Sequence, residues 1–276
     1  MEILPSLGVP VLGIHPVGGT EAHISMERLM RQVQDPLFQK RVAALEAQGV
    51  CVEYHCHALS YLLPRELFGT KPDWFRMNRD GIRVADTNCC ASNPEALEAI
   101  SLACAKLAGD LPTTNHRYHL WLDDISDGGC YCEHCRQMSR SDQALTIVHA
   151  MLDGLKRTDP KAKLSYLAYH ETIEAPQLRP HPDVYLEYAP MNRDYHLPLN
   201  TPDCEKNIQQ FRPLENLIRT FGKKDATALD YWMDNSLFSG WKKPPKRLVP
   251  NLSVAAADAE LYVWLAWNIL QPLLAI

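Results

Sequence analysis

The sequence lacks the features that mark membrane-spanning and nucleic-acid-binding proteins. Its 33 acidic residues outnumber its 28 basic residues, for a formal net charge of -5, and no basic stripe stands out along the chain. We therefore expect no nucleic-acid partner. The most apolar segment, residues 261–276, contains Asn268, Gln271 and Pro272, and is too short and too interrupted to cross a bilayer. The N-terminus has neither a basic region nor a small-residue cleavage site, so no signal peptide is predicted.

Two kinds of catalytic motif are also missing. No GxGxxG or Walker loop follows the first apolar segment, which argues against a nucleotide cofactor. No GxSxG motif is present, which disfavours an esterase with a serine nucleophile. The composition is that of an ordinary globular protein, with 46% hydrophobic and 22% charged residues. A chain of this length can bury a sizeable core.

The nine cysteines are an odd number, in a chain far longer than the small secreted scaffolds that disulfides hold together. They indicate a reducing compartment or a metal site, and free cysteines favour a cytoplasmic location. Cys130, Cys132 and Cys135 fall within one loop between a predicted strand and a predicted helix. Thiols with this spacing suit a tetrahedral metal site, to which Cys89 or Cys90 would add the fourth ligand, with His134 as a weaker candidate. Buried free thiols or a disulfide are the alternative interpretation.

Short apolar segments alternate with longer segments of helical periodicity, which predicts a parallel α/β sheet. We expect strands at residues 9–14, 50–55, 118–122, 164–169, 184–188, 226–232 and 262–267. Helices are expected at 26–48, divided at Pro36, and at 93–108, 135–158, 204–221 and 252–260. A closed barrel of this type needs eight strands and about seven are found. The fold class predicted is therefore a (β/α)8 TIM-like barrel that is incomplete or open.

Polar and aromatic side chains collect near the ends of the predicted strands, which in a (β/α) barrel form the rim that carries the active site. The residues expected to bind substrate are His55, His57, Trp74, Tyr169, His170, Trp232 and Asp234. For each histidine a structural role is at least as well supported, and most aromatic residues of a barrel pack in its core. His55 and His57 could also hold a metal together with Cys56, although an arrangement without metal is favoured.

Asp123 and Asp124 close the strand predicted at 118–122. Successive side chains of a strand point to opposite faces, so both serve one site only if the chain turns there, as the following Ser-Asp-Gly-Gly sequence permits. Adjacent carboxylates repel each other, which raises the proton affinity of one and suits it to act as a general acid. The alternative is an aspartate that caps a loop or pairs with an arginine. Candidates for a second carboxylate are Glu171, Glu187, Asp230 and Asp234.

Several short motifs follow one another in a characteristic order. They lie at residues 72–78 (PDWFRMN), 81–83 (GIR), 90–95 (CASNPE), 123–124 (DD) and 129–135 (GCYCEHC). In this order they resemble the domain-of-unknown-function 4838 family of bacterial proteins, over roughly residues 50–260. Members of that family are similar to glycoside hydrolases with a TIM-barrel fold, related to the hexosaminidase and α-glucuronidase groups.

The resemblance implies a (β/α) barrel that acts on carbohydrate. For the cysteines it implies a metal site made by Cys90, Cys130, Cys132 and Cys135. Asp123 and Asp124 resemble the paired acids of substrate-assisted hexosaminidases, in which one acid orients an N-acetyl group and the other protonates the leaving oxygen. The His-x-Gly-Gly sequence that precedes that pair in hexosaminidases is absent here, since residues 118–122 read YHLWL.

We therefore expect residues 1–276 to form a single glycoside hydrolase-like barrel domain that uses carboxylate acid–base catalysis at its C-terminal rim. Asp124 would be the general acid, Asp123 would orient the substrate or stabilise positive charge, and Glu171 or Glu187 is the alternative second carboxylate. A structural zinc ion with no part in the chemistry is expected. The alternatives are a non-catalytic carbohydrate-binding barrel and a metal-dependent hydrolase. Besides the carbohydrate, the expected partners are a second copy of the chain or missing companion domains.

Overall fold

The structure is a computed structural model that describes residues 10–16, 18–111, 113–194, 197–230 and 262–265. Trp232, Asp234 and the helix expected at 252–260 lie outside the described residues. Within the described part of the chain, no helix is long and apolar enough to cross a membrane.

The chain divides into two compact units. The first consists of Met1–Tyr166 with His181–Val184, and the second of Leu167–Pro180 with Tyr185–Ile276.

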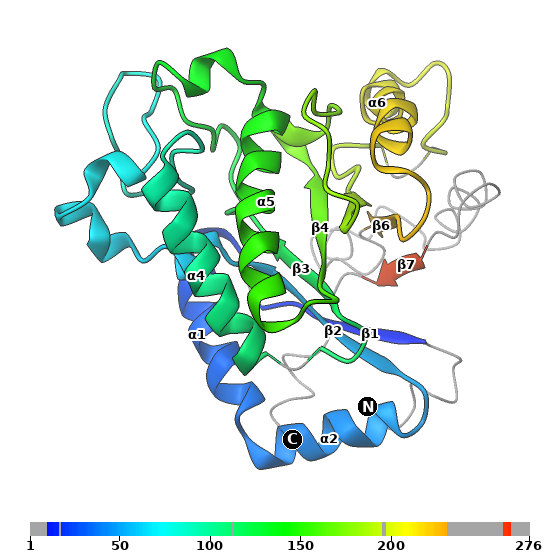
Figure 1. Cartoon of the computed structure of the whole chain (residues 1–276). Helices are drawn as coiled ribbons and strands as arrows, with labels where there is room; N and C mark the ends of the chain where they lie inside the picture. Colours follow the sequence, from blue (N-terminus) through cyan, green and yellow to red (C-terminus); the bar gives the residue numbers. More distant parts are fainter. Residues whose placement is uncertain (1–9, 17, 112, 195–196, 231–261, 266–276) are drawn as a thin grey trace. The chain divides into compact units, whose positions relative to one another are not determined.

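The first unit contains a parallel sheet whose strands follow one another in chain order (Figure 1). Its strands are β1 (Val11–Ile14), β2 (Cys51–His57), β3 (Arg117–Trp121) and the first part of β4 (Lys163–Ala168). β1 pairs with β2, β2 with β3, and β3 with β4, each time in parallel. The four strands expected in this part of the sequence are thus confirmed, with small differences at their ends.

The α-helices of the first unit are α1 (Ala22–Val33), α2 (Pro36–Glu46), the short α3 (Leu59–Leu62), α4 (Pro94–Asp110) and α5 (Arg140–Thr158). Three of these five described helices, α2, α4 and α5, begin at a side-chain cap. The Asp35 side chain accepts hydrogen bonds from two backbone N–H groups of the first turn of α2, which confirms the expected division at Pro36. Asn93 caps α4 in the same way, with Pro94 at the first helical position.

α5 begins later than expected. The periodicity predicts a helix from residue 135, but Cys135–Gln137 form a single 3-10 turn and α5 starts at Arg140. Ser139 is the reason, because its hydroxyl accepts a hydrogen bond of 3.0 Å from the backbone N–H of Asp142 and so caps a new helix.

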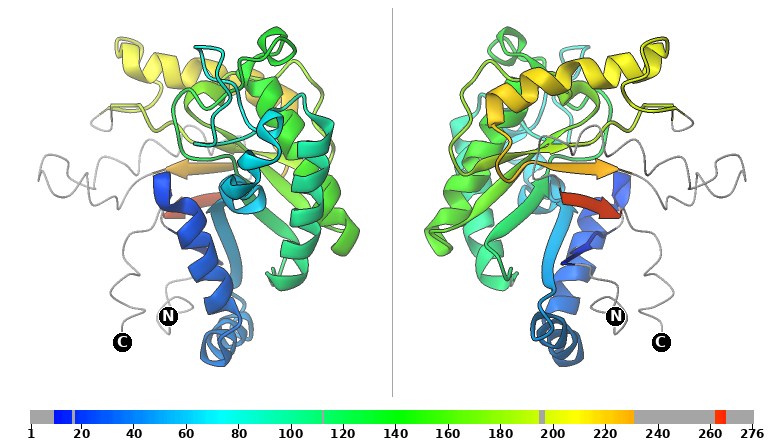
Figure 2. Two further views of the ribbon diagram at one scale, coloured as in Figure 1. Left: turned by 90° about the vertical axis from the view of Figure 1, so that its left-hand side faces the viewer. Right: turned by 90° about the vertical axis from the view of Figure 1, so that its right-hand side faces the viewer.

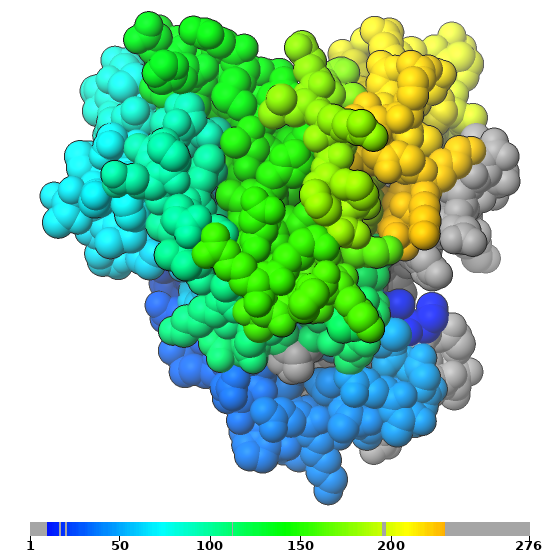
Figure 3. Space-filling model, in the orientation of Figure 1, coloured from blue at the N-terminus to red at the C-terminus, as the bar shows by residue number. Residues whose placement is uncertain are grey.

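α4 and α5 pack directly against each other, as the views in Figures 1 and 2 agree. Gly154 of α5 allows the close approach, since a Cβ at that position would lie only 2.0 Å from the carbonyl oxygen of Ser101 in α4. In the space-filling view the two helices form a continuous surface (Figure 3). They therefore act as one layer over the sheet of the first unit.

The second unit continues the alternation of strand and helix. It contains β5 (Val184–Tyr188) apart from its first residue, α6 (Glu205–Phe221), β6 (Thr227–Asp230) and β7 (Tyr262–Leu265). β5 pairs with β6 and β6 with β7, again in parallel. The α/β class is confirmed, and the described residues contain the seven strands expected of an open barrel without showing an eighth.

Candidate functional site

One face of β2 and β3 carries most of the histidines of the candidate site. Glu53, His55 and His57 alternate along β2 and share a face, and the strand register places His55 beside His119 and His57 beside Trp121. The imidazoles of His55 and His119 stack with their centroids 3.7 Å apart, and the ring of His57 lies 5.0 Å from that of Trp121. All five side chains are buried, and His57 lies at the end of the strand.

His57 and Asp124 both border Gly18, where the first three strands end. Nδ1 of His57 lies 2.6 Å from the backbone oxygen of Leu122. A carbonyl only accepts hydrogen bonds, so Nδ1 of His57 is the donor in this contact. A Cβ at Gly18 would lie 3.1 Å from Cδ2 of His57 and 3.4 Å from Oδ2 of Asp124. Both side chains therefore lie close to the backbone at Gly18, which follows β1.

His15 lies at the same place and was not among the site residues predicted from the sequence. It follows β1 directly, and its ring centroid lies 5.9 Å from that of His57 and 5.4 Å from that of Trp121. Burial, and then the neighbouring His57 and His55, lower the pKa of His15 to about 4, so the ring is neutral near pH 7. His15 directly follows the strand predicted at residues 9–14, so the choice of polar residues at strand ends would have included it. Nothing in the sequence marks Gly18.

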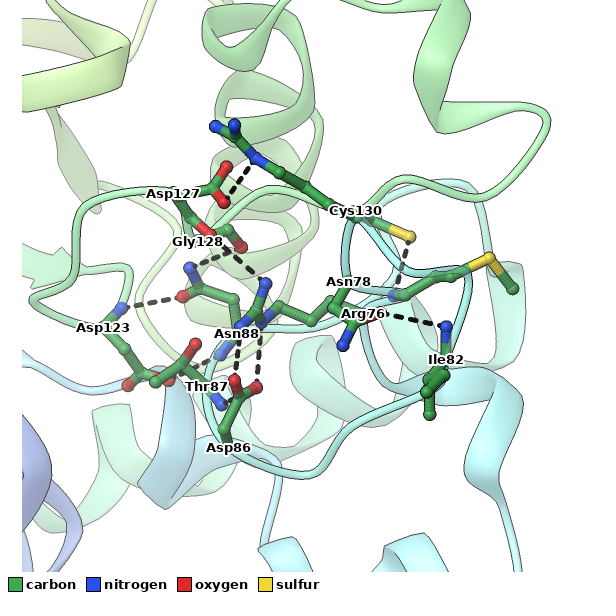
Figure 4. A network of polar contacts seen from close by, with 12 residues as sticks. Arg76, Asn78, Ile82, Asp86, Thr87, Asn88, Asp123, Asp127, Gly128 and Cys130 are labelled. Atoms are coloured by element: carbon green, nitrogen blue, oxygen red, sulfur yellow. Dashed lines mark hydrogen bonds and ion pairs between the residues drawn. The ribbon is translucent and has the colours of Figure 1, made fainter.

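The two adjacent aspartates have different surroundings. The buried carboxylate of Asp123 accepts hydrogen bonds from the N–H of Ser60 at 2.9 Å, the hydroxyl of Ser60 at 2.6 Å and the N–H of Asn88 at 2.7 Å. In return, the side-chain oxygen of Asn88 accepts from the N–H of Asp123 at 2.8 Å (Figure 4). Asp124 is half-buried and lies beside Gly18 instead. The structure thus places Asp124 beside Gly18, which His57 also borders.

A polar network holds the loop between α3 and α4 against the segment that follows β3 (Figure 4). Arg76 forms an ion pair with Asp86, and its Nη1 donates to the backbone oxygen of Asp127 at 3.2 Å. Nδ2 of Asn88 donates to the backbone oxygen of Gly128 at 3.0 Å. The α3–α4 loop therefore holds the chain both before Asp124, at Asp123, and after it, at Asp127 and Gly128.

Trp74 belongs to the same loop and lies at the N-terminus of α4. Its Nε1 donates to Oε2 of Glu95 at 3.1 Å, and the ammonium group of Lys71 lies 5.1 Å from the ring centroid. These contacts anchor the indole to α4. Stacking of Trp74 on a sugar stays a prediction.

The remaining described candidates, Tyr169, His170, Glu171 and Glu187, belong to the second unit. The rings of Tyr169 and His170 are 3.9 Å apart, and the hydroxyl of Tyr169 donates to Sδ of Met191 at 3.0 Å. Glu171 is half-buried in the 3-10 turn His170–Thr172. Glu187 lies within β5 and is fully buried.

The four cysteines selected from the sequence form a cluster. One Sγ atom from each of Cys90, Cys130, Cys132 and Cys135 lies within 4.8 Å of all the others. Sγ of Cys90 is 3.6 Å from that of Cys132 and 3.9 Å from that of Cys135. Zinc bound to four thiolates at about 2.3 Å needs sulfur atoms about 3.8 Å apart. The donor set and its spacing therefore fit a tetrahedral zinc ion.

Neighbouring side chains support this thiol cluster. The hydroxyl oxygen of Ser92 lies 3.3 Å from the sulfur atoms of Cys90 and Cys135, and 3.4 Å from that of Cys132. Gln143 of α5 accepts a hydrogen bond from the N–H of Cys130 and donates one to the backbone oxygen of Cys135, each at 2.8 Å. Hydrogen bonds from Cys130 and Cys135 hold the pKa of the Cys90 thiol well below its usual value.

The other cysteines stand apart from the cluster. All nine cysteines are free thiols, which removes the disulfide alternative in this structure. Cys89, the second candidate for the fourth ligand, is buried, and burial raises its pKa, as it does for Cys56 and Cys104. Cys51 and Cys204 are half-buried.

Two solved structures similar to this chain are glycosidases. A β-N-acetylhexosaminidase from Bacteroides fragilis is 12% identical, with a TM-score of 0.48, over 84% of this chain and 47% of that one. An exo-β-1,4-mannosidase from Opitutaceae bacterium strain TAV5 is 12% identical, with a TM-score of 0.46, over 98% of this chain and 49% of that one. This chain spans about half the length of those two.

No curated protein matches the chain. The family described as a domain of unknown function (DUF4838) matches residues 23–222, which is more than half of the chain, and the chain belongs to that family.

Proposed function

We propose that the chain is a glycoside hydrolase domain with Asp124 as its general acid. The observation that carries this proposal is that the side chains of Asp124 and His57 both border Gly18, where β1, β2 and β3 end. In a (β/α) barrel the C-terminal ends of the strands carry the active site. His15 borders the same place, and its neutral imidazole can hydrogen-bond to sugar hydroxyls.

Asp123 supports this site without touching the substrate in our proposal. Its carboxylate is hydrogen-bonded to Ser60 and Asn88. These bonds hold the end of β3, where Asp124 begins the next segment. We therefore assign Asp123 a positioning role, in place of the substrate-orienting role expected from its sequence.

Hydrolysis of a glycoside needs a second carboxylate, either as a nucleophile or as the base that activates water. The sequence predicts Glu171 or Glu187 for this role. Glu187 is fully buried within a strand, whereas Glu171 is half-buried in a turn after β4. Both residues belong to the second unit, and the role of second carboxylate stays a prediction for each of them.

The test of Asp124 uses the dependence on the leaving group. A general acid contributes about 10²- to 10⁴-fold when the leaving group needs a proton. We expect Asp124→Asn to lower kcat by this amount on an oligosaccharide or methyl glycoside, and much less on the nitrophenyl glycoside of the same sugar. The matched control is Asp80→Asn, an exposed acid of the α3–α4 loop, which should leave both rates unchanged. Equal rates for wild type and Asp124→Asn on the poor leaving group would refute the assignment.

A non-catalytic carbohydrate-binding domain is the second candidate. The hydrogen bonds of Asp123 to Ser60 and Asn88 favour this candidate, because they occupy one of the two adjacent carboxylates. Only the other carboxylate, Asp124, then borders Gly18. Binding on a glycan array without any product after long incubation would support this second candidate. Turnover of any bound glycan that is lost in Asp124→Asn would exclude it.

We also propose that the thiol cluster holds a structural zinc ion. Four thiolates complete the tetrahedral shell, which is typical of structural sites, whereas catalytic zinc keeps an open position. This donor set therefore argues against the metal-dependent hydrolase. Mild chelation should lower the melting temperature and leave activity intact below the new transition. Loss of activity without a change in melting temperature would make the metal catalytic.

A further inference from the structure

A second group of ligand atoms lies inside the sheet of the first unit. One donor atom from each of Glu53, His55 and His119 lies within 4.8 Å of the others, and all three residues are buried. They come from β2 and β3, and neither the thiol cluster nor the proposed acid uses them. We propose that these three side chains form a second metal site, for a divalent transition-metal ion.

The distances suit an ion held by three donors. Oε2 of Glu53 lies 2.6 Å from Nε2 of His119 and 3.7 Å from Nε2 of His55. An ion bound at about 2.0–2.2 Å to each donor requires donor atoms about 3.0–3.5 Å apart. One observed distance is below this range and the other above it, so shifts of less than about 1 Å bring both within it. The two imidazoles stack with an interplanar angle of 13°, and sliding one ring over the other provides such a shift.

The other oxygen of Glu53 is held in place by residues at the start of β3. Nδ2 of Asn115 donates to Oε1 at 2.5 Å, and Nε of Arg117 lies 3.5 Å from the same atom. Outer contacts of this kind orient the carboxylates and imidazoles that bind metals. They turn Oε2 toward the two imidazoles. The side chain of Arg117 is 12% exposed, so water partly screens its positive charge from a bound cation.

The chemistry of the donors sets the class of ion. Two imidazoles and one carboxylate bind first-row ions such as Zn²⁺, Fe²⁺ or Co²⁺, whereas the four thiolates form a softer site. An ion here would link β2 to β3 and compensate the buried carboxylate of Glu53. We therefore expect it to stabilise the first unit.

A titration of the metal-free full-length protein with Co²⁺ tests this site and separates it from the thiol cluster. Thiolate ligands give intense charge-transfer absorption, while nitrogen and oxygen ligands give only weak d–d bands. We expect two equivalents of Co²⁺ per chain, one with the charge-transfer band and one without it. Glu53→Gln, which keeps the side-chain size, should lose only the second equivalent. The control His116→Gln removes an imidazole that is 46% exposed and paired with Asp159, and should still bind two.

The outcomes are distinct. A wild-type protein that binds only the equivalent with charge-transfer absorption, or none, overturns this proposal. A wild-type protein that binds only the equivalent without it supports this site and refutes the thiol site. Where Glu53→Gln does not fold, NMR of the cobalt-loaded wild type decides, because histidines bound to Co²⁺ show strongly shifted exchangeable imidazole protons. Their absence at saturation would also overturn the proposal.

Discussion

Asp123 and Asp124 show how two neighbouring residues of one type acquire different roles. Both residues follow the end of β3 at Trp121, where the chain bends. One carboxylate lies among the donors of Ser60 and Asn88, and the other borders Gly18. The roles follow from what surrounds each side chain, so they can be separated by measuring stability and activity on the same variants.

Asp123→Asn should destabilise the protein more than Asp124→Asn. Hydrogen bonds to a charged group contribute about 1.5–3 kcal/mol each, and an amide would turn an N–H toward donors that need an acceptor. We expect a loss of about 2–4 kcal/mol in the free energy of unfolding for Asp123→Asn, measured in urea, and less than about 1 kcal/mol for Asp124→Asn. Unchanged stability in Asp123→Asn would instead favour a direct contact between Asp123 and the substrate.

His15 should make stability depend on pH. Mainly through burial, its pKa falls to about 4 in the folded chain, against 6.5 for an ordinary histidine. The unfolded chain therefore takes up the proton first on acidification. The stability that the neutral ring provides is fully present above pH 6.5 and is lost as the pH falls toward 4.

This difference is measurable by urea unfolding at about pH 7 and about pH 4. Between them we expect wild type to lose on the order of 1–3 kcal/mol more than His15→Gln, in which this group cannot titrate. Other groups titrate equally in the two proteins and cancel in the comparison. Parallel losses would show that His15 is protonated as easily in the folded chain as in the unfolded one.

At the scale of elements, the contact between α4 and α5 depends on one missing side chain. In Gly154→Ala the new Cβ would lie 2.0 Å from the carbonyl oxygen of Ser101, so the helices must move apart. We expect a loss of about 1–3 kcal/mol or more, measured in urea. The control is Gly109→Ala near the end of α4, where the nearest atom would be 3.9 Å away. There, alanine should add up to about 1 kcal/mol through its helix propensity. Similar effects at both positions would contradict this close packing.

At the scale of the whole molecule, the boundary between the two compact units falls inside two strands. β4 passes from the first unit to the second after Tyr166, and β5 does so after Val184. Unfolding one unit would therefore break strands that the other unit shares. We expect a single calorimetric transition whose measured enthalpy equals the van 't Hoff enthalpy. Two transitions would contradict the prediction that residues 1–276 form a single domain.

The sequence by itself determined the features that depend on near neighbours in the chain. The alternation of apolar strands with amphipathic helices predicted the parallel α/β class, and Asn93 and Pro36 marked helix starts correctly. The spacing of Cys130, Cys132 and Cys135 marked one side of the thiol cluster. Local hydrogen bonds and periodicity carry this information, so it can be read without knowing the fold.

Only the tertiary structure decided which distant residues meet. It brought Cys90 to the other three thiols, placed His15 and Gly18 beside His57, and gave Asp123 and Asp124 different surroundings. It also put Glu53 of β2 beside His119 of β3, a pair 66 residues apart in the chain. The physical reason is that strand register and loop packing fix these contacts. Register follows from the pairing of whole strands, which no single segment of the sequence encodes.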